Sequence, residues 1–334
     1  MLESVIVKDV ERIATKLSSN FVNKSVLVTG GAGFLGSWLC DILVASKAKV
    51  TCIDNLSTGL TENIEHHKGE QNFQFINVDV SKFETGGKQD FILHLASRAS
   101  PEEYQQHPIE TLTANSLGSL KMLETARKHD ATILYTSTSE VYGDAQIIPT
   151  PETYWGHVNP VGVRSCYDEG KRFSEALFTA YHRQYGLDTR IVRIFNTYGP
   201  RIRADGAYAR ALPKFISQAL KNQPITVYGD GAQTRSFCYV TDTIQGILTT
   251  LINTKTKGEI FNIGNPHEIT ILELANKIKR TINSKSKITF HPLPLDDPKR
   301  RCPDITKIST TLGWKPETDF EDGLKKTIEW YSQR

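Results

Sequence analysis

The sequence predicts an α/β protein whose core is a doubly wound parallel β-sheet. Two observations predict the sheet: a glycine-rich turn joins a short apolar strand to an apolar helix, and further short strands alternate with helical segments up to about residue 200. A third observation is composition, since 334 residues with 39% hydrophobic content suffice for one large domain or two ordinary ones.

Charge and composition exclude several classes of function. The formal net charge is +3, from 40 basic and 37 acidic residues, so a broad basic surface for nucleic acid is not expected. No run of about 18 apolar residues predicts a membrane span, and residues 1–23 form an amphipathic pattern without the apolar centre of a signal peptide. The five cysteines are scattered, so we expect no disulfide framework, no metal site and a reducing, cytoplasmic location.

The glycine-rich turn follows the first predicted strand. Residues 24–29 form this strand, and residues 30–36 (GGAGFLG) lead into an apolar helix. Glycines in this context let backbone N–H groups approach a pyrophosphate at the helix N-terminus. The next strand ends at Asp54, where a carboxylate would bind ribose hydroxyls and repel a 2′-phosphate. The sequence therefore predicts NAD in preference to NADP; the alternative is a plain turn with a surface aspartate.

The later strands of the first half bring polar groups to one edge of the sheet. The strand at 73–77 leads to Asp79, where an acid could meet the adenine amino group, and a further apolar strand contains His94, which we interpret as a core histidine. After a helix over about 107–128, another strand delivers residues 137–140 (STSE) to the edge where ligands collect in such sheets. A helix N-cap cluster is the alternative interpretation of these hydroxyls.

Tyr167 and Lys171 lie four residues apart in a helical segment, so they share one face of the helix. A free tyrosine titrates near pH ~10, and a nearby ammonium favours the phenolate and lowers that pKa. The pair is therefore a candidate general base for an alcohol proton. The alternative is a packed tyrosine beside a solvated lysine, but the preceding glycine turn and hydroxyl cluster favour catalysis.

The order of these features resembles the extended short-chain dehydrogenase/reductase superfamily, and finer motifs resemble the UDP-glucuronate decarboxylases within it. The motifs are residues 136–143 (TSTSEVYG), 154–160 (YWGHVNP), 162–172 (GVRSCYDEGKR), 193–201 (RIFNTYGPR), 233–237 (QTRSF) and 296–304 (DDPKRRCPD). The resemblance covers the chain after residue 23. Two positions depart from it: Thr113 replaces a frequent lysine and His107 a frequent asparagine. If that lysine contacts the substrate carboxylate in relatives, another group must do so here.

The resemblance implies a division of the chain into two parts. Residues 1–200 would form a Rossmann NAD-binding domain, and residues 201–334 a smaller, mostly helical substrate domain. Residues 236–255 would return to the first domain. Members of the superfamily pair two helices into a four-helix dimer interface, here the helices at about 107–128 and 168–186. We therefore expect a homodimer, with Leu117, Leu120, Leu123, Leu177, Phe178 and Tyr181 on the apolar faces.

The implied reaction is the decarboxylation of UDP-glucuronate to UDP-xylose and carbon dioxide. NAD⁺ would oxidise C4, the resulting 4-keto acid would lose carbon dioxide, and reduction at C4 would regenerate NAD⁺. The nearest alternatives are a sugar-nucleotide 4-epimerase and a 4,6-dehydratase, although a dehydratase would need an acid where this chain has Ser139. A non-catalytic NAD-sensing regulator is a further alternative, but it would have little reason to keep the hydroxyl cluster with the Tyr–Lys pair.

The resemblance also implies the roles of individual residues. Tyr167 would take the O4 proton, Lys171 would hold the tyrosinate and the nicotinamide ribose, and Thr138 would hold the C4 oxygen. Glu140 and Arg301 would handle the carboxylate and the C5 proton. The predicted cofactor contacts are Gly30, Gly33, Phe34, Leu35, Gly36, Asp54, Asn55, Ser57, Gly59, Asp79, Val80, Leu95, Ala96, Ser97, Tyr167, Lys171, Tyr198 and Arg203. The predicted substrate contacts are Tyr104, Glu140, Arg164, Asn196, Tyr228, Arg235 and Arg301, and no metal ligand is predicted.

Overall fold

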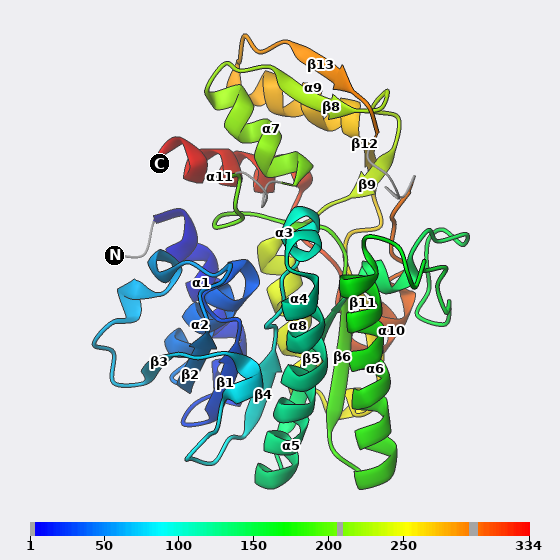
Figure 1. The fold of residues 1–334 in the computed structure, drawn as a ribbon. Helices are drawn as coiled ribbons and strands as arrows, with labels where there is room; N and C mark the ends of the chain where they lie inside the picture. Colours follow the sequence, from blue (N-terminus) through cyan, green and yellow to red (C-terminus); the bar gives the residue numbers. More distant parts are fainter. Residues whose placement is uncertain (1–3, 206–209, 294–299) are drawn as a thin grey trace.

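A computed structural model describes residues 4–205, 210–293 and 300–334 (Figure 1). Its centre is a seven-stranded sheet with the order β11-β6-β5-β4-β1-β2-β3. Every pairing in this sheet is parallel. The strands are β1 (Ser25–Thr29), β2 (Lys49–Asp54), β3 (Phe73–Asn77), β4 (Phe91–His94), β5 (Thr132–Thr138), β6 (Thr189–Ile194) and β11 (Ile260–Ile263). The predicted doubly wound parallel sheet is confirmed, and β11 is an edge strand that the sequence analysis did not identify.

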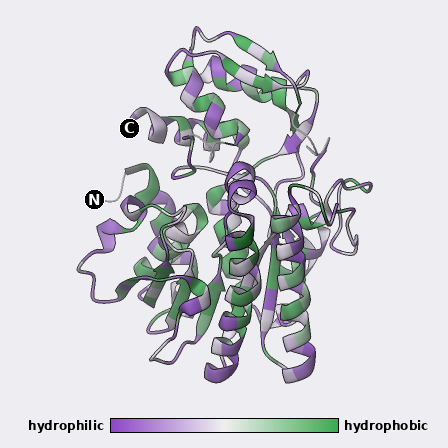
Figure 2. Ribbon diagram, viewed as in Figure 1, coloured by the Kyte–Doolittle hydropathy of each residue, from purple (hydrophilic) through white to green (hydrophobic). Residues whose placement is uncertain are grey.

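Helices cover both faces of this sheet. One face packs against α1 (Ser4–Leu17), α2 (Phe34–Ala45) and α8 (Val240–Ile252), and the other against α5 (Ser119–His129) and α6 (Ser165–Tyr185). Figure 2 shows hydrophobic residues concentrated in the strands and hydrophilic residues toward the ends of α5 and α6 that lie farthest from the smaller lobe. A parallel sheet is stable only when both faces are covered in this way.

Alternating strand residues supply the two hydrophobic cores. Val26 and Val28 of β1 pack into the core beneath α1 and α2, whereas Leu27 packs into the core beneath α5 and α6. Successive side chains of a strand point to opposite faces, so a continuous apolar strand is needed when both faces are buried. His94 ends β4 fully buried, with Thr29 Oγ1 2.8 Å from Nδ1 and Ser119 Oγ 3.1 Å from Nε2. Burial lowers its pKa to about 3, which confirms a neutral core histidine.

The helix predicted over about 107–128 is present but interrupted. It begins as α4 (Pro108–Thr113), passes through a π-helical turn at Ala114–Gly118 and continues as α5, and a separate short helix, α3 (Pro101–Gln106), precedes it. At the π-helical turn the backbone carbonyl of Asn115 accepts a hydrogen bond from Ser174 of α6. This contact uses a carbonyl of the wide turn and joins the two helices beside the end of β5.

The smaller lobe follows the Rossmann part and lies above it in Figure 1. It contains α7 (Ala211–Leu220), α9 (Ile271–Ile282), α11 (Phe320–Ser332), the parallel pair β8 (Ile225–Tyr228) with β13 (Ile288–His291) and the antiparallel pair β9 (Thr234–Ser236) with β12 (Glu268–Thr270). Three helices beside two short strand pairs agree with the expected mostly helical lobe.

Part of the second half returns to the sheet lobe. The strand β10 (Cys238–Tyr239) pairs with β7 (Thr197–Tyr198), α8 packs on the sheet, and α10 (Thr306–Leu312) packs against β11. The return is therefore longer than the expected 236–255, because β11 and α10 belong to it. Across the described ranges, no helix is both long enough and apolar enough to cross a membrane.

Candidate active site

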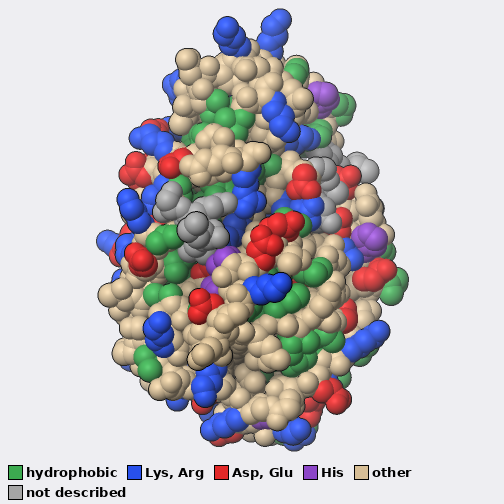
Figure 3. All heavy atoms as spheres, turned by 90° about the vertical axis from the view of Figure 1, so that its left-hand side faces the viewer, with side chains coloured by type: hydrophobic (Ala, Val, Ile, Leu, Met, Phe, Trp, Pro, Cys, Tyr) green, Lys and Arg blue, Asp and Glu red, His purple; other side chains and the backbone are tan. Residues whose placement is uncertain are grey.

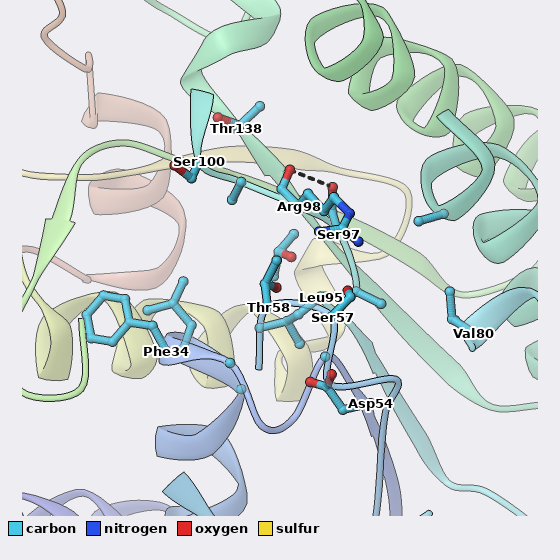
Figure 4. Close-up of a pocket in the computed structure, with 18 of the residues that line it drawn as sticks. Phe34, Asp54, Ser57, Thr58, Val80, Leu95, Ser97, Arg98, Ser100 and Thr138 are labelled. Atoms are coloured by element: carbon cyan, nitrogen blue, oxygen red, sulfur yellow. Dashed lines mark hydrogen bonds between the residues drawn. The ribbon is translucent and has the colours of Figure 1, made fainter. Parts of the chain in front are cut away.

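A cavity of about 340 Å³ lies along the C-terminal edge of the sheet (Figure 4). It extends from the glycine turn before α2 to the end of β5, as expected for ligands of an open parallel sheet. Most of the predicted cofactor contacts line it: Gly30, Gly33, Phe34, Leu35, Gly36, Asp54, Asn55, Ser57, Asp79, Val80, Leu95, Ala96, Ser97, Tyr167, Lys171 and Arg203. The structure thus brings together residues that lie far apart in the sequence.

The glycine turn leaves room that only glycine provides. Gly30 has φ +68°, and a Cβ on Gly36 would lie 2.1 Å from the carbonyl oxygen of Gly30. The N-terminus of α2 follows at Phe34, with Gly33 at the N-cap. Backbone N–H groups at such a helix start favour a pyrophosphate, so this part of the cavity fits the dinucleotide that the sequence predicts.

Asp54 connects the glycine turn to the loop that follows β2. Its Oδ2 accepts a hydrogen bond from the Ala32 N–H at 3.0 Å, and its Oδ1 accepts one from the Leu56 N–H at 2.8 Å. Burial raises the pKa of this carboxyl above its ordinary value. On the same loop, Asn55 Nδ2 donates to Asp79 Oδ2 at 2.9 Å. The predicted ribose contact, Asp54, is therefore held by backbone N–H groups, and the predicted adenine contact, Asp79, by Asn55.

A buried ionic cluster joins α2 to the chain segment that follows this loop. Asp41 of α2 lies 2.8 Å from His66 Nε2, 2.7 Å from His67 Nε2 and 2.8 Å from Arg201 Nη2. Although burial raises the pKa of Asp41, Arg201 and the two histidines lower it from 3.8 to about 2. Its contribution to stability is therefore present above pH 3.8 and is lost as the pH falls toward 2. The donor atoms of Asp41, His66 and His67 lie within 4.8 Å of one another, a possible metal-binding group that the sequence analysis did not anticipate.

Thr138, Tyr167 and Lys171 meet at the inner end of the cavity. Thr138 ends β5, and Tyr167 and Lys171 come from the first two turns of α6, where both side chains are buried. Tyr167 makes a hydrogen bond with Thr138. Lys171 Nζ donates to the carbonyl oxygen of Thr136 at 2.8 Å and lies 5.8 Å from the centre of the Tyr167 ring. The structure thus brings together the three residues that the sequence analysis proposed as base, cation and oxygen-binding hydroxyl.

The expected lowering of the Tyr167 pKa by Lys171 is not what this geometry gives. Burial raises the pKa of Tyr167 to about 12, and the contributions that oppose burial come from Arg210 and the hydrogen bond with Thr138. Burial also lowers the pKa of Lys171 to about 7, because the ammonium sits in a largely apolar pocket. A cation on another element, Arg210, therefore takes over part of the role that the sequence suggested for Lys171.

Glu140 lies between two arginines just beyond Thr138. Arg301 Nη1 is 2.7 Å from Glu140 Oε1, and Arg164 pairs with Oε2. Arg301 also donates to Ser139 Oγ at 3.2 Å. Although burial raises the pKa of Glu140, Arg301 and Arg164 hold it at about 2. Glu140 is therefore ionised at neutral pH, and the chain places a carboxylate and two guanidinium groups near Tyr167.

A second cavity of about 370 Å³ begins at this cluster and extends under the smaller lobe. In Figure 3, acidic and basic side chains gather across the middle of the face, between the two lobes. Most of the predicted substrate contacts line the cavity: Glu140, Arg164, Asn196, Tyr228, Arg235 and Arg301. Asn196 Nδ2 is buried without a hydrogen-bond partner in the described part of the chain, as expected for a donor awaiting a ligand. Ser100, Thr197, Ile202 and Arg210 line both cavities, so the two adjoin.

Three predicted contacts are not brought to the expected cavity. Tyr198 packs among aromatic rings, and its hydroxyl donates to the carbonyl oxygen of Phe320 at 3.0 Å, so it does not line the cofactor cavity. Tyr104 is 1% exposed and lines neither cavity; its ring stacks on that of Tyr167, with centroids 4.9 Å apart. Gly59 does not line the cofactor cavity either. It packs against Asp54, and a Cβ on Gly59 would lie 2.8 Å from Asp54 Oδ2.

The sequence analysis missed several charged residues that line the cavities. Arg98, Glu110, Arg201 and Arg210 line the first cavity, and Arg210 donates to the carbonyl oxygen of Ala99. Arg201 ends the motif at residues 193–201 but was not assigned to a ligand site, and the other three belong to no quoted motif; the fold brings their separate segments together. The two positions that depart from the decarboxylase pattern, His107 and Thr113, line neither cavity. The arginine pair around Glu140 is one cationic group in the second cavity that a carboxylate could meet in their place.

A family model described as GDP-mannose 4,6 dehydratase matches residues 27–327. The chain belongs to this family. It is 48% identical over 318 residues to UDP-glucuronic acid decarboxylase 1 of Danio rerio, which covers 95% of this chain and 75% of that relative. It is also 48% identical over 303 residues to UDP-glucuronic acid decarboxylase 3 of Arabidopsis thaliana, with 90% and 87% coverage.

Solved structures of the same superfamily have the same fold. UDP-glucose 4-epimerase of Thermotoga maritima, with UDP-glucose, superposes with a TM-score of 0.85 at 30% identity over 92% of this chain and 99% of that chain. A dTDP-glucose 4,6-dehydratase of Streptomyces venezuelae, with NAD bound, gives a TM-score of 0.84 at 28% identity over 92% and 97%. The resemblance to the extended short-chain dehydrogenase/reductases is confirmed, and family membership agrees with a nucleotide-sugar enzyme on a Rossmann sheet.

Proposed function

We propose that this protein is an NAD-dependent UDP-glucuronate decarboxylase, which forms UDP-xylose and carbon dioxide. The observation that carries the proposal is the Glu140 carboxylate held between Arg164 and Arg301, next to Thr138 and Tyr167. A sugar carboxylate needs cations at this place, and a simple alcohol substrate does not. Relatives that are 45–48% identical over most of the chain carry the same activity in their names.

The residues around the first cavity fit the oxidation of a sugar hydroxyl. NAD supplies, when bound, the acceptor and later the donor of the hydride at C4. Thr138 holds the C4 oxygen, and Tyr167 takes the O4 proton and returns it at the end of the cycle. Because burial raises the pKa of Tyr167 to about 12, its phenolate depends on the opposing effects of Arg210, which lines the same cavity, and of the hydrogen bond with Thr138.

The cluster at the start of the second cavity fits the loss of carbon dioxide. A ketone at C4 makes the sugar acid a β-keto acid, so electrons left at C5 are delocalised into the C4 oxygen, which Thr138 and Tyr167 bind. Arg164 and Arg301 hold the carboxylate before it leaves, and ionised Glu140 keeps both guanidinium groups in place. The same cluster borders C5, where a proton must be added after carbon dioxide departs.

The proposal is tested by mass spectrometry of the product formed from UDP-glucuronate. We expect a UDP-pentose that has lost one carbon and two oxygens, together with released carbon dioxide. A UDP-hexuronate of unchanged mass that separates from the substrate on chromatography would support a 4-epimerase, and a product that has lost water would support a dehydratase. Unchanged substrate with bound NAD would support a non-catalytic regulator.

The first expected result of this proposal concerns the cofactor. Since each cycle regenerates NAD⁺, the purified protein should retain NAD without any being added. Denaturation and analysis of the supernatant should release NAD, because the Asp54 carboxylate disfavours the 2′-phosphate of NADP. Active protein free of dinucleotide would contradict tight retention, and NADP in the supernatant would contradict the role of Asp54.

A second expected result concerns assembly, since we also propose a homodimer through α4, α5 and α6. The apolar face differs from the one predicted. Leu123, Phe178 and Tyr181 point toward the sheet and are buried in the core beneath α5 and α6. The exposed apolar residues are Ile109 (69%), Leu112 (39%), Leu117 (56%), Leu120 (40%) and Phe173 (50%). These residues lie on α4, α5, α6 and the turn between α4 and α5, which pack against one another, and exposed apolar residues on neighbouring helices are typical of an interface.

Light scattering coupled to gel filtration should give twice the chain mass of 37.5 kDa. Phe173→Asp should convert the dimer into a monomer, because it places a charge in the proposed interface. Phe290→Asp, the same change at an exposed phenylalanine of β13 in the smaller lobe, is the matched control and should remain dimeric. A monomer without any substitution would contradict the proposal.

All five cysteines are free thiols, which supports our proposal of a cytoplasmic location.

A further inference from the structure

Asp168 follows the catalytic tyrosine in α6 and is not used by the proposed reaction. It is 6% exposed, and its Oδ1 is buried without a hydrogen-bond partner among the residues that the structure describes. Its Oδ2 lies 3.9 Å from Arg164 Nε. A buried carboxylate oxygen without a donor is costly when it is charged, and the cost falls when the group is protonated. The geometry of Asp168 therefore favours the neutral acid.

The surroundings of Asp168 favour the same state. The titratable and charged groups that face it are Glu140, Arg164, Arg301, Glu169, Tyr167, Tyr104 and Cys166. Burial and the Glu140 carboxylate raise the pKa of Asp168 to about 7, against the opposing effect of Arg164 and Arg301. Asp168 thus changes its charge near neutral pH, while Glu140, whose pKa is about 2, stays ionised.

The charge of the cluster then depends on Asp168. Arg164 stands between two carboxylates, since it pairs with Glu140 and approaches Asp168. With neutral Asp168, the two guanidinium groups of Arg164 and Arg301 exceed the single negative charge of Glu140 by one. With ionised Asp168, these two guanidinium groups and the two carboxylates balance, and Arg210, which also lowers the pKa of Glu140, is the further cation beside them. A substrate carboxylate that binds at Arg164 and Arg301 while Asp168 is ionised would meet a second carboxylate without surplus charge on this arginine pair, so its binding would be weaker than with neutral Asp168.

We propose that Asp168 is a positioning residue whose neutral form leaves Arg164 and Arg301 the surplus positive charge that receives the carboxylate of the UDP-sugar acid. Asp168 lines neither cavity, so it acts through Arg164 and does not touch the substrate. The inference rests on the proposed function, because it needs a sugar carboxylate at the arginine pair. By linkage, binding of that carboxylate must favour protonation of Asp168, and the affinity must fall as Asp168 ionises.

The test compares the affinities of UDP-glucuronate and UDP-xylose, which differ by the carboxylate. Both are measured by calorimetry at pH 6 and pH 8.5 in the NAD-loaded Tyr167→Phe variant, in which turnover should be slow. We expect UDP-glucuronate to lose about tenfold more affinity than UDP-xylose over this range, as for a pKa that rises by about one unit on binding. Titration of Lys171, whose pKa is also about 7, affects both ligands and cancels in the ratio.

Asp168→Asn in the same background should remove this dependence, so that the affinity ratio at pH 8.5 equals the ratio at pH 6. Glu169→Gln is the matched control, because it removes the adjacent carboxylate, which is more exposed and pairs with Arg172 outside the cluster. It should keep the dependence. If Asp168→Asn fails to fold, calorimetry with Asp168 intact decides: near pH 7.5, UDP-glucuronate binding should take up more protons than UDP-xylose binding, and equal uptake would contradict the role of Asp168.

Two results would overturn the role of Asp168. One is an affinity ratio that does not change with pH when Asp168 is intact, and the other is an unchanged pH dependence of the ratio in Asp168→Asn. Product analysis of the protein without substitutions is judged separately. Release of carbon dioxide together with a pH-independent affinity ratio would keep the proposed function and reject the role of Asp168. A pH-dependent ratio without carbon dioxide release would keep the carboxylate site and reject the decarboxylase.

Discussion

Tyr167→Phe should slow the decarboxylation of UDP-glucuronate by ~10²–10⁴-fold, the usual contribution of a positioned acid–base group. The substitution removes the phenol that hydrogen-bonds with Thr138 and keeps the ring. That ring is buried and stacks on Tyr104 at an interplanar angle of 3°, so the packing of α6 should be retained. The loss should therefore appear in the rate of oxidation at C4, while the fold and the bound NAD remain.

Single-turnover experiments should follow NADH absorbance and carbon dioxide release together. Tyr104→Phe is the matched control, since its hydroxyl is buried without a hydrogen-bond partner in the described structure. It should turn over within a few-fold of the parent protein. A large loss in Tyr104→Phe would restore the substrate contact that the sequence predicted for Tyr104, and near-normal turnover by Tyr167→Phe would reject the central role of Tyr167.

Gly36→Ala should abolish the retention of NAD and destabilise the protein by about 3 kcal/mol, at the upper end of the usual cost of overpacking. The added Cβ would lie 2.1 Å from the carbonyl oxygen of Gly30 and 2.7 Å from the Cα of Gly31. Both are backbone atoms of the turn that would cradle the pyrophosphate. Relief of the clash therefore has to move the turn itself, and with it the N–H groups that face the cofactor.

Thermal unfolding and the dinucleotide content of the purified protein measure these two effects. Gly87→Ala is the matched control, because a Cβ there meets no atom within 4 Å. It should keep both the midpoint of unfolding and the bound NAD. A Gly36→Ala protein that still releases NAD on denaturation would mean that the turn can yield, and would separate the glycine pattern from cofactor binding.

The parts of the fold that depend on local chemistry could be predicted from the sequence. The turn at residues 30–36, the acid at Asp54 and the spacing of Tyr167 and Lys171 each specify a local geometry, and the structure brings them to one edge of the sheet. Glu140 and Arg301 were joined by resemblance alone, and their ion pair of 2.7 Å gives that pairing a physical cause.

The parts of the site that depend on how distant segments of the chain come together could not be predicted. Arg210 directly precedes α7 and donates to the carbonyl oxygen of Ala99, just before α3. This contact between distant segments brings Arg210 to both cavities, and no local sequence pattern marks it. Tyr198 lies in a motif of the family, yet its burial is decided by aromatic neighbours from α11 and β10. The raised pKa of Tyr167 likewise reflects burial, which residue spacing does not reveal.

The central claim is that the protein oxidises C4, removes the carboxylate and reduces C4 again without releasing its cofactor. The most direct test is incubation with UDP-glucuronate that carries deuterium at C4 and carbon-13 at C6, followed by mass spectrometry and NMR of the product. We predict UDP-xylose that retains deuterium at C4, with all of the carbon-13 recovered as carbon dioxide. A product that keeps the labelled carbon, or a UDP-pentose that has lost the deuterium to solvent, would contradict the account.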